Sequence, residues 1–330
     1  MTHTKPIHII TDVQDDTLGE AIAVLSAIGA IISAYGCDTE DKLIAAGRDA
    51  VVLLLYLART PVPRRVIEAL PACRHIARAG IGVDQIDLNA ATEKGILVTN
   101  LPDYCIDEVA THAVALLLAS ARKITHLDRH VRGDRYDYMA AQPVFRLAGR
   151  TVGLVGFGRI GRSAARKLQG FEVKLLVCDP YVPVEAIKEH SAEPADLETL
   201  LRRSDYVCLF LPVTPETHHL IGAKELALMK PTAYLINTSR GNLIDQKALV
   251  QALQDRRIAG AGLDVLEREP PAHGDVLLTL DNVILTPHTA WYSEESVRDN
   301  RLQAAEEVVR VLSGQPPRHL VNKPKEVTSL

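Results

Sequence analysis

Three side chains suited to acid–base chemistry and anion binding follow separate apolar segments in the last third of this 330-residue chain. Arg240 comes after YLINTS, Glu269 follows GLDVLER, and His288 follows NVILTP. If these segments are neighbouring parallel strands, their carboxyl ends lie at one edge of a sheet, which is the edge where ligands bind. We therefore expect the three side chains to meet at one site.

These residue types suit the transfer of a hydride between a hydroxy acid and a cofactor. A histidine titrates in the range that lets it exchange the hydroxyl proton, and a glutamate can orient the imidazole and raise its pKa. The planar guanidinium of Arg240 fits a substrate carboxylate and polarises a carbonyl oxygen. Taken alone, each side chain also fits a structural role, as a surface ion pair, a solvated loop acid or a capped loop histidine. Their positions at consecutive strand ends favour the catalytic interpretation.

A glycine-rich motif, GFGRIG at residues 156–161, comes earlier in the chain. A bare G-x-G-x-x-G pattern is weak evidence, but this one follows the apolar segment TVGLV and opens the helical segment RIGRSAARKL. Gly156 would permit a tight turn, Gly158 the close approach of the backbone to a pyrophosphate, and Gly161 the packing of helix on strand. The amides at the start of the helix would hold the phosphates.

An acidic residue, Asp179, ends the next apolar segment, eighteen residues beyond Gly161. A carboxylate at this distance accepts hydrogen bonds from the adenosine ribose hydroxyls and repels a 2′-phosphate. Pro180 and Tyr181 follow it, and neither is basic. The sequence therefore predicts NAD as the cofactor in preference to NADP, although a strand-end aspartate can also simply cap a turn.

The elements that position these residues are short apolar segments that alternate with helical ones. Runs of Ile, Val and Leu without polar alternation are typical of strands buried on both faces. Their alternation with amphipathic stretches predicts parallel sheets with helices on both faces. The strands predicted in the first third are 7–10, 30–34, 50–57, 75–79 and 96–98, and those predicted later are 151–155, 173–178, 206–211, 233–237, 261–265 and 283–285.

Two longer helices frame the second series of strands. Residues 106–122 are apolar nearly all round, which predicts a buried helix between two bodies of the protein and a domain boundary. Residues 294–312 predict a closing helix with one buried face and Ser293 as its N-cap. A chain of 330 residues also exceeds what one compact core usually holds.

The composition excludes several classes of partner. The 37 basic and 41 acidic residues give a net charge of −4, and only 4% of the residues are aromatic, so we expect no nucleic-acid partner. The longest apolar run, 50–58, is too short to span a bilayer, and no signal-peptide core is present, which predicts a cytoplasmic protein without a membrane partner. The five cysteines and the histidines show no ligand spacing typical of a metal site.

The chain resembles the D-isomer-specific 2-hydroxyacid dehydrogenase family over nearly its whole length. The resemblance is carried by RAGIGVDQIDLNAATEKGILVTN, TVGLVGFGRIGRSAARKL, LINTSRGNLIDQKALVQAL, GAGLDVLEREP and ILTPHTAWYSEES. The last motif, with Trp291-Tyr292-Ser293, is most similar to the branch that contains the C-terminal-binding proteins, which are NAD(H)-dependent transcriptional corepressors retaining the dehydrogenase site.

The resemblance implies an α/β fold with two Rossmann-like, doubly wound parallel-sheet domains and a cleft between them. Residues 1–100 and 289–330 would form a discontinuous substrate-binding domain, and residues 101–288 the NAD-binding domain. It also implies a homodimer built through the NAD-binding domains. The implied activity is an NAD-dependent oxidoreductase that interconverts a small 2-oxo acid and its D-2-hydroxy acid.

The resemblance also assigns roles to individual residues. Arg240 would bind the substrate, Glu269 and His288 would be the acid/base pair, and Asp264 would contact the nicotinamide amide. The other positions that match cofactor contacts are Gly156, Gly158, Arg159, Ile160, Gly161, Asp179 and Thr238. The other positions that match substrate contacts are Arg78, Ile81, Gly82 and Trp291, where the amides of Ile81 and Gly82 would hold the substrate carboxylate.

Departures from the family patterns leave the substrate open. The corepressors carry a histidine where this chain has Leu57, and many members have an acidic residue where it has Thr111. Arg59 could receive a phosphate, which would favour a phosphoglycerate- or hydroxypyruvate-type dehydrogenase, whereas Trp291 favours an apolar substrate tail. The chain also ends without the regulatory extension of many phosphoglycerate dehydrogenases. An NAD(H)-sensing interaction protein of corepressor type is the alternative from another functional class.

Overall fold

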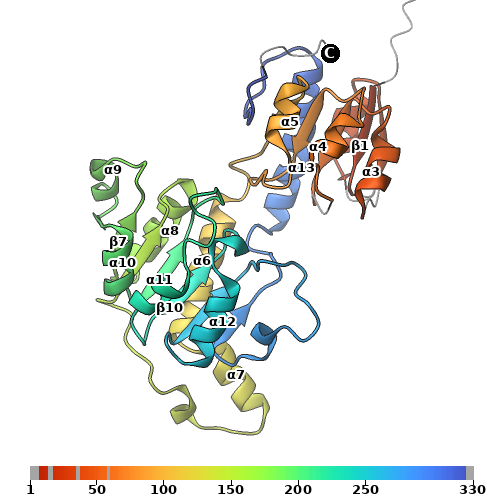
Figure 1. The fold of residues 1–330 in the computed structure, drawn as a ribbon. Helices are drawn as coiled ribbons and strands as arrows, with labels where there is room; N and C mark the ends of the chain where they lie inside the picture. The colour runs from red at the N-terminus through yellow and green to blue at the C-terminus, as the bar shows by residue number, and fades with distance from the viewer. Residues whose placement is uncertain (1–6, 14–17, 35–37, 58–59, 325–330) are drawn as a thin grey trace, which may run out of the picture. The chain divides into compact units, whose positions relative to one another are not determined.

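The protein divides into two compact units. The structure is a computed structural model that describes residues 7–13, 18–34, 38–57 and 60–324. The first unit comprises Met1–Cys105 and Ser293–Leu330, and the second unit comprises Ile106–Tyr292 (Figure 1). The sequence-based boundaries, after residues 100 and 288, lie within five residues of these. The binding functions expected of the two domains stay predictions.

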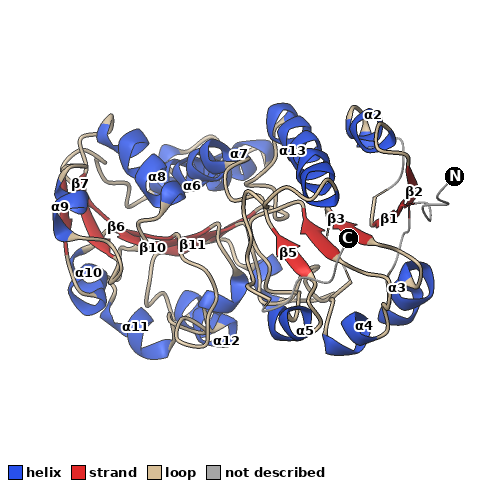
Figure 2. Cartoon of the chain, turned by 90° about the horizontal axis from the view of Figure 1, so that it is seen from above, coloured by secondary structure: helices blue, strands red, loops and turns tan. Residues whose placement is uncertain are grey.

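The first unit contains a five-stranded parallel sheet in the order β2-β1-β3-β4-β5. Alternate residues of each strand point to opposite faces, so that Val52 packs toward α2 and α13 whereas Leu53 packs toward α3 and α4 (Figure 2). The elements are β1 (Ile7–Thr11), α2 (Ala21–Ser26), β2 (Ala30–Ala34), α3 (Glu40–Gly47), β3 (Val52–Leu55), α4 (Arg64–Glu68), β4 (His75–Arg78), α5 (Leu88–Glu93), β5 (Leu97–Thr99) and α13 (Glu294–Leu312).

The last helix, α13, completes the first unit. Its N-terminus is closed by a reciprocal pair, in which Ser293 Oγ accepts from the Ser296 amide and Ser296 Oγ accepts from the Ser293 amide, both at 2.9 Å. Ala304 and Val308 are buried in the apolar cluster that α13 shares with α2 and the sheet. The C-terminal segment therefore supplies one of the two helical layers that cover this sheet.

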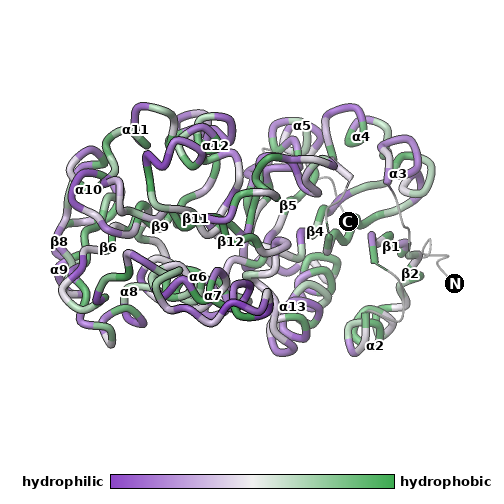
Figure 3. Tube along the Cα trace, turned by 90° about the horizontal axis from the view of Figure 1, so that it is seen from below, coloured by the Kyte–Doolittle hydropathy of each residue, from purple (hydrophilic) through white to green (hydrophobic). Residues whose placement is uncertain are grey.

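The second unit contains a seven-stranded parallel sheet in the order β12-β11-β10-β9-β6-β7-β8. Helices α6 and α8 cover one face, and α10, α11 and α12 cover the other (Figure 2). The central strands β6 and β9 are mostly hydrophobic, as expected of strands buried on both faces (Figure 3). The fold is thus α/β with two parallel sheets.

The second unit is built from the following elements in chain order. They are α6 (Ile106–Ala121), α7 (Ile124–Arg132), η1 (Tyr138–Ala141), β6 (Thr151–Val155), α8 (Arg159–Gln169), β7 (Lys174–Cys178), α9 (Val184–Lys188), β8 (Ala192–Pro194), α10 (Leu197–Arg203), β9 (Tyr206–Leu209), α11 (Ala223–Leu228), β10 (Tyr234–Asn237), η2 (Gly241–Leu243), α12 (Gln246–Gln254), β11 (Gly260–Leu263), η3 (Val276–Thr279) and β12 (Val283–Leu285).

The prediction that the helix at 106–122 is buried on every side is wrong. Helix α6 buries Ala113 and Leu117 against α8 and the sheet, but Thr111 and Ala115 are exposed. The alanines raise the hydropathy of the exposed face although each offers little surface to bury. The helix is therefore one-sided, as expected for a layer that covers a sheet.

Two further observations bear on sequence-based expectations. Cys73, Cys105, Cys178 and Cys208 form no disulfide with one another, and Cys37 lies outside the described residues. Among the helices in the described part of the chain, none combines the length and apolar character needed to cross a membrane.

A buried histidine in the first sheet predicts a pH-dependent stability. His75 is fully buried, with Nε2 2.8 Å from Thr99 Oγ1, and burial lowers its pKa to about 3. The His75 imidazole of the unfolded chain takes up a proton near pH 6.5, whereas burial keeps the folded chain from doing so. The contribution of His75 to the free energy of unfolding is therefore fully present above that pH. As the pH falls from 6.5, the free energy of unfolding should decrease by up to about 1.4 kcal/mol per pH unit.

Urea unfolding at several pH values measures this slope. The variant His75→Leu removes the titrating group, so its stability should vary less with pH between 6.5 and 4 than that of the wild type. An equal slope in the two proteins would show that His75 is not the group responsible. The comparison of slopes is independent of any overall loss of stability that the substitution causes.

Candidate active site

The GFGRIG motif forms the turn between β6 and α8. Gly156 has φ 92° and lies so close to Phe210 that a Cβ atom would be 2.4 Å from its carbonyl oxygen. A Cβ atom on Gly161 would be 2.5 Å from the Gly156 carbonyl oxygen. A Cβ atom on Gly158, in contrast, would meet nothing within 4 Å, and no side chain caps the helix there. The first and third glycines are thus required by packing, whereas the second leaves space over the start of α8.

Asp179 follows β7 and fixes the glycine turn. Its Oδ2 accepts a hydrogen bond from the Phe157 amide at 2.7 Å, and its Oδ1 accepts one from the Tyr181 amide at 2.9 Å. The carboxylate therefore has the turn-capping role that was one of the two interpretations. Since a carboxylate has about four acceptor positions, these two bonds leave capacity for ribose hydroxyls.

The segment after β10 brings Thr238 and Arg240 to the carboxyl edge of the sheet. Asn237 holds its turn, because Nδ2 donates to the Arg240 carbonyl at 2.8 Å and Oδ1 accepts from the Ser239 amide at 3.0 Å. Ser239 Oγ donates to the Leu209 carbonyl at 2.7 Å. Thr238 Oγ1 is buried and has no hydrogen-bond partner in the described structure. A buried hydroxyl without a partner calls for an explanation, and a bound ligand at this edge of the sheet would supply one.

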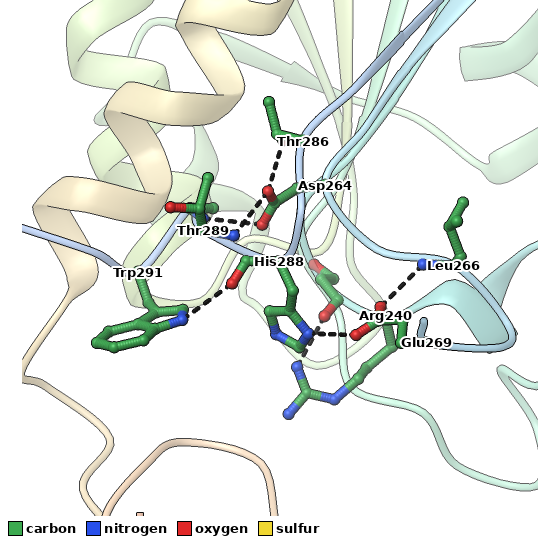
Figure 4. Close-up of polar contacts among 10 residues, drawn as sticks. Arg240, Asp264, Leu266, Glu269, Thr286, His288, Thr289 and Trp291 are labelled. Atoms are coloured by element: carbon green, nitrogen blue, oxygen red, sulfur yellow. Dashed lines mark hydrogen bonds and ion pairs between the residues drawn. The ribbon is translucent and has the colours of Figure 1, made fainter. Parts of the chain in front are cut away.

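Arg240 lies beside the loop that carries Glu269. A Cβ atom on Gly241 would be only 1.9 Å from the Leu266 carbonyl carbon, so the two loops are packed backbone against backbone. Arg240 Nη1 donates to the Ser239 carbonyl at 2.8 Å. The guanidinium points toward His288 and the Glu269 carboxylate (Figure 4). Arginine, glutamate and histidine therefore meet in the second unit, as their positions at the strand ends predicted.

The pair at the centre of the site is His288 and Glu269. His288 Nδ1 lies 2.6 Å from Glu269 Oε2, while Glu269 Oε1 accepts from the Leu266 amide at 2.9 Å (Figure 4). Burial raises the pKa of Glu269, but the hydrogen bond and charge of His288, the Leu266 amide and the charge of Arg240 outweigh it and hold the pKa below its usual value. Glu269 is thus an ionised partner that fixes Nδ1 and leaves Nε2 for a substrate.

Asp264 clamps the loop that carries His288. Its side chain is fully buried, with Oδ1 accepting from Thr286 Oγ1 at 2.5 Å and the Thr289 amide at 2.9 Å, and Oδ2 accepting from the Ala290 amide at 2.8 Å. The His288 amide donates to the Asp264 carbonyl at 2.9 Å. These bonds hold His288 at φ 53°, a conformation that side chains other than glycine rarely adopt. The nicotinamide contact expected of Asp264 stays a prediction.

Sequence reasoning missed two members of this clamp. Thr286 contacts both Asp264 and His112, whose Nε2 lies 2.9 Å from Thr286 Oγ1. The position of Thr286 two residues before His288 is the signal that could have indicated it. His112 of α6 is 174 residues away in the chain, and nothing in the sequence links the two.

Trp291 lies close to His288 in the chain, and the N–H group of its indole already makes a hydrogen bond. Its Nε1 donates to the His288 carbonyl at 3.0 Å (Figure 4). Its ring meets the Tyr292 ring edge to face, with the centroids 5.8 Å apart. The indole therefore supports the backbone of His288. The expected contact with an apolar substrate tail stays a prediction.

The candidate substrate residues of the first unit form a braced loop after β4. Arg78 is half-buried, and a Cβ atom on Gly80 would be 2.6 Å from its guanidinium carbon. The Ile81 carbonyl accepts from Asn100 Nδ2 at 2.7 Å. Arg59 lies outside the described residues. The carbonyls to which Arg78 donates are those of Leu55, Tyr56, Ala79 and Gly82. Arg78 thus fixes the backbone around Ile81 and Gly82.

Among the described residues, no group of three or more His, Cys, Asp and Glu side chains is arranged to hold a metal ion.

Comparison with known proteins identifies the family. The model of the D-isomer specific 2-hydroxyacid dehydrogenase NAD-binding domain matches residues 114–290. The chain belongs to this family. The glyoxylate reductase of Korarchaeum cryptofilum is 43% identical over 279 residues, which are 83% of each chain. The D-3-phosphoglycerate dehydrogenase of Methanocaldococcus jannaschii is 39% identical over 313 residues, and this chain spans 59% of its length. The crystal structure of D-lactate dehydrogenase from Aquifex aeolicus with NAD and lactic acid superimposes with a TM-score of 0.88, at 29% identity, and covers 96% of this chain and all of that one.

The assignment of this D-2-hydroxyacid dehydrogenase to the branch of the C-terminal-binding proteins is wrong. Relatives that match most of the chain at 39–43% identity include glyoxylate reductases and D-3-phosphoglycerate dehydrogenases. The assignment depended on the short motif Trp291-Tyr292-Ser293, whereas these relatives match over most of the chain. The family's cofactor is NAD and its reaction interconverts 2-oxo and D-2-hydroxy acids, so the chain is an NAD-dependent oxidoreductase of this class.

The described residues fit a dinucleotide. The uncapped start of α8, the open space over Gly158 and the unpartnered Thr238 hydroxyl lie in the second unit, along the carboxyl edge of its sheet. Arg159 and Ile160 occupy the first turn of α8, where backbone amides and the helix dipole favour phosphate.

Proposed function

We propose that this D-2-hydroxyacid dehydrogenase reduces glyoxylate and related small 2-oxo acids with NADH, in a site formed by Arg240, Glu269 and His288. The observation that carries the proposal is the 2.6 Å contact between His288 Nδ1 and Glu269 Oε2, beside the Arg240 guanidinium. The names of relatives that are about 40% identical over most of the chain support the substrate class.

The acid in the proposed reaction is the His288 imidazolium. Bound NADH supplies the hydride that reduces the carbonyl carbon of the 2-oxo acid. His288 donates the proton on Nε2 to the carbonyl oxygen, and Nδ1 keeps its proton in the bond to Glu269. In the reverse direction, neutral His288 accepts the hydroxyl proton at Nε2, and the ionised Glu269 stabilises the resulting positive charge.

Substrate binding is assigned to two kinds of donor. The Arg240 guanidinium presents paired N–H groups to the substrate carboxylate and polarises the carbonyl oxygen. The amides of Ile81 and Gly82 in the first unit are the second set of donors to the carboxylate. The first unit is accordingly the proposed substrate-binding domain and the second the NAD-binding domain.

The fit of the second unit to a dinucleotide supports the proposed cofactor contacts. The amides at the start of α8 and Arg159 would hold the pyrophosphate, and Asp179 would accept from the ribose hydroxyls. Since Asp179 is acidic, it disfavours the extra phosphate of NADP. Ile160, Thr238 and Asp264 complete the proposed contacts.

A homodimer built through the second unit is the proposed assembly. Helix α7 buries none of its residues, and apolar side chains are exposed along it and the segment that follows. Exposed apolar patches of this kind mark protein–protein contacts. Their most exposed members are Ile124, Val131, Tyr136 and Tyr138. Sedimentation equilibrium should give twice the chain mass. We also propose a cytoplasmic location for the protein.

The experiment that tests the function is an initial-rate screen with NADH and NADPH. Glyoxylate, hydroxypyruvate, phosphohydroxypyruvate, pyruvate and phenylpyruvate cover small, phosphorylated and apolar substrates. We expect NADH oxidation with glyoxylate or hydroxypyruvate and a clear preference over NADPH. A rate that is highest with phosphohydroxypyruvate would favour the phosphoglycerate-type alternative. NADH binding without turnover on any of the five acids would refute the proposal.

The substitution Glu269→Gln tests the role of the carboxylate. An amide keeps a hydrogen bond to Nδ1 but cannot balance the charge on the imidazolium, so kcat should fall by about ten- to a hundredfold. Because the pKa of Glu269 lies below its usual value, wild-type Glu269 is ionised throughout the neutral range. The loss should therefore persist across the neutral range. A variant with wild-type kcat at pH 7 would show that the charge of Glu269 is not needed.

A further inference from the structure

Helix α6 sends a polar side chain to the loop that carries His288. His112 belongs to α6, and its Nε2 lies 2.9 Å from Thr286 Oγ1 and 3.6 Å from Asp264 Oδ1. The His112 side chain is partly exposed, whereas that of Asp264 is fully buried. The chain enters the second unit at α6 and leaves it after Tyr292. His112 therefore links the first helix of this unit to its last segment, and the mechanism proposed above gives this imidazole no role.

The supply of protons fixes the direction of these hydrogen bonds. Asp264 also accepts from two backbone amides, so its carboxylate acts as an acceptor. The Thr286 hydroxyl has one proton and donates it to Asp264 Oδ1 at 2.5 Å (Figure 4). The same hydroxyl can only accept in its contact with His112, so His112 Nε2 carries a proton. The bonds thus run from the imidazole through the hydroxyl to the carboxylate.

The carboxylate at the end of this chain of bonds holds the backbone of His288. Asp264 accepts from the Thr289 and Ala290 amides through its side chain and from the His288 amide through its carbonyl. His288 has φ 53°, and a residue other than glycine keeps such a conformation only where the surrounding structure holds it. A change in the bonds of Asp264 therefore reaches the His288 imidazole through the backbone.

His112 strengthens this support at a distance from the imidazole of His288. A hydroxyl that accepts a hydrogen bond becomes a better donor, so the bond from His112 strengthens that of Thr286 to Asp264. The effect is larger beside a buried carboxylate than it would be in water. Within the described residues, His112 Nδ1 makes no hydrogen bond, so Nε2 is the atom through which the side chain acts.

We propose that His112 is a positioning residue for His288, which acts by donating a hydrogen bond from Nε2 to Thr286. The inference rests on the proposed role of His288 as the acid of the reductase reaction. Without the donor, the turn after Thr286 is held less tightly. A smaller fraction of the molecules then has the His288 imidazole aligned for proton transfer.

The tautomer of His112 tests the direction of the hydrogen bond in the unaltered protein. Long-range proton–nitrogen NMR correlation of the full-length protein, labelled in its histidines, distinguishes a proton on Nε2 from one on Nδ1. The signal of His112 is assigned by its loss in His112→Gln. We expect the proton on Nε2, with and without NADH, at a pH where the ring is neutral. A proton on Nδ1 alone would overturn the proposal.

Two substitutions at His112 separate the donor from the ring. His112→Phe keeps a ring but removes the N–H group, so kcat should fall by about three- to tenfold, as expected for the loss of one hydrogen bond. KM for the 2-oxo acid and Kd for NADH should change by less than about twofold, because the proton is transferred only in the reaction step. His112→Gln keeps an N–H group near the position of Nε2 and should restore kcat. His273→Phe, at an exposed histidine of the same unit, is the matched control and should leave kcat unchanged.

A double-mutant cycle with Thr286→Val tests whether His112 acts through the hydroxyl. If it does, the double variant with His112→Phe should have the same kcat as Thr286→Val alone. Losses that multiply would overturn the proposal, as would a Gln variant as slow as the Phe variant. A Phe variant with a lower melting temperature but the wild-type kcat would show that His112 is only structural.

The same series separates this inference from the proposed function. Wild type and His288→Asn are assayed beside the His112 variants. If these two proteins differ as proposed while His112→Phe matches the wild type, only the positioning role fails. A wild type that reduces no 2-oxo acid would refute the proposed function, whereas the tautomer of His112 would still decide the direction of its hydrogen bond.

Discussion

The variant His288→Asn should lose about two to four orders of magnitude in kcat while it retains NADH binding. Asparagine is the sharper substitution because His288 has φ 53°, and Asn adopts this conformation more readily than alanine does. It also keeps a hydrogen-bonding partner for Glu269. The amide has no titratable group in the neutral range, so the proton for the carbonyl oxygen is lost.

Stopped-flow measurement of single-turnover reduction and fluorescence titration of NADH separate the two effects. His273→Asn, in the exposed segment between Glu269 and β12, controls for the loss of a histidine and should leave both quantities unchanged. If His288→Asn keeps more than a tenth of the wild-type kcat, His288 is not the acid.

The second large effect is expected from Arg240→Lys. The lysine keeps the charge but loses the paired N–H groups, each of which is a charge-assisted hydrogen bond to the substrate. We expect kcat/KM for the 2-oxo acid to fall by about two orders of magnitude, since such a bond contributes about 1.5–3 kcal/mol. Much of the loss should fall on KM, because the carboxylate is bound before the reaction as well as during it.

A matched substitution makes the comparison specific. Arg202→Lys alters an exposed arginine of α10 that pairs with Glu198 of the same helix, and it should leave kcat/KM unchanged. Equal KM values for wild type and Arg240→Lys would mean that Arg240 does not bind the substrate carboxylate.

The sequence predicted those features whose signals are local. The strands 30–34, 151–155 and 283–285 and the helix 294–312 have the predicted bounds, because unbroken apolar runs and clear caps mark them. The glycine turn was also predictable, since backbone geometry restricts Gly156 and Gly161 to glycine.

Two elements were missed for different reasons. Helix α7 buries none of its residues, but Ile124, Leu127 and Val131 recur at helical spacing, a pattern that does predict an amphipathic helix. Strand β8 is three residues long and ends in Pro194, so it carries no strand pattern. The exposed side of α6 was mistaken for a buried one because alanine is apolar at either place.

The sequence indicated which side chains meet at the site, but not which residues hold them in place. Arg240, Glu269 and His288 could be grouped because parallel strands end at one edge. The clamp of Asp264, Thr286 and His112 depends on side-chain contacts between segments far apart in the chain, which spacing does not report. In the same way, nothing in the spacing indicates that the Arg78 guanidinium donates to four backbone carbonyls, and its expected contact with the substrate stays a prediction.

Reduction of hydroxypyruvate with NADH that carries deuterium at both C4 positions of the nicotinamide tests the proposed reaction most directly. Chiral chromatography and mass spectrometry of the product report its configuration and the position of the label. We predict D-glycerate with one deuterium at C2, formed by the wild type and at a rate at least about a hundredfold lower by His288→Asn. L-glycerate, a racemic product or D-glycerate without deuterium would contradict hydride transfer to a 2-oxo acid at this site.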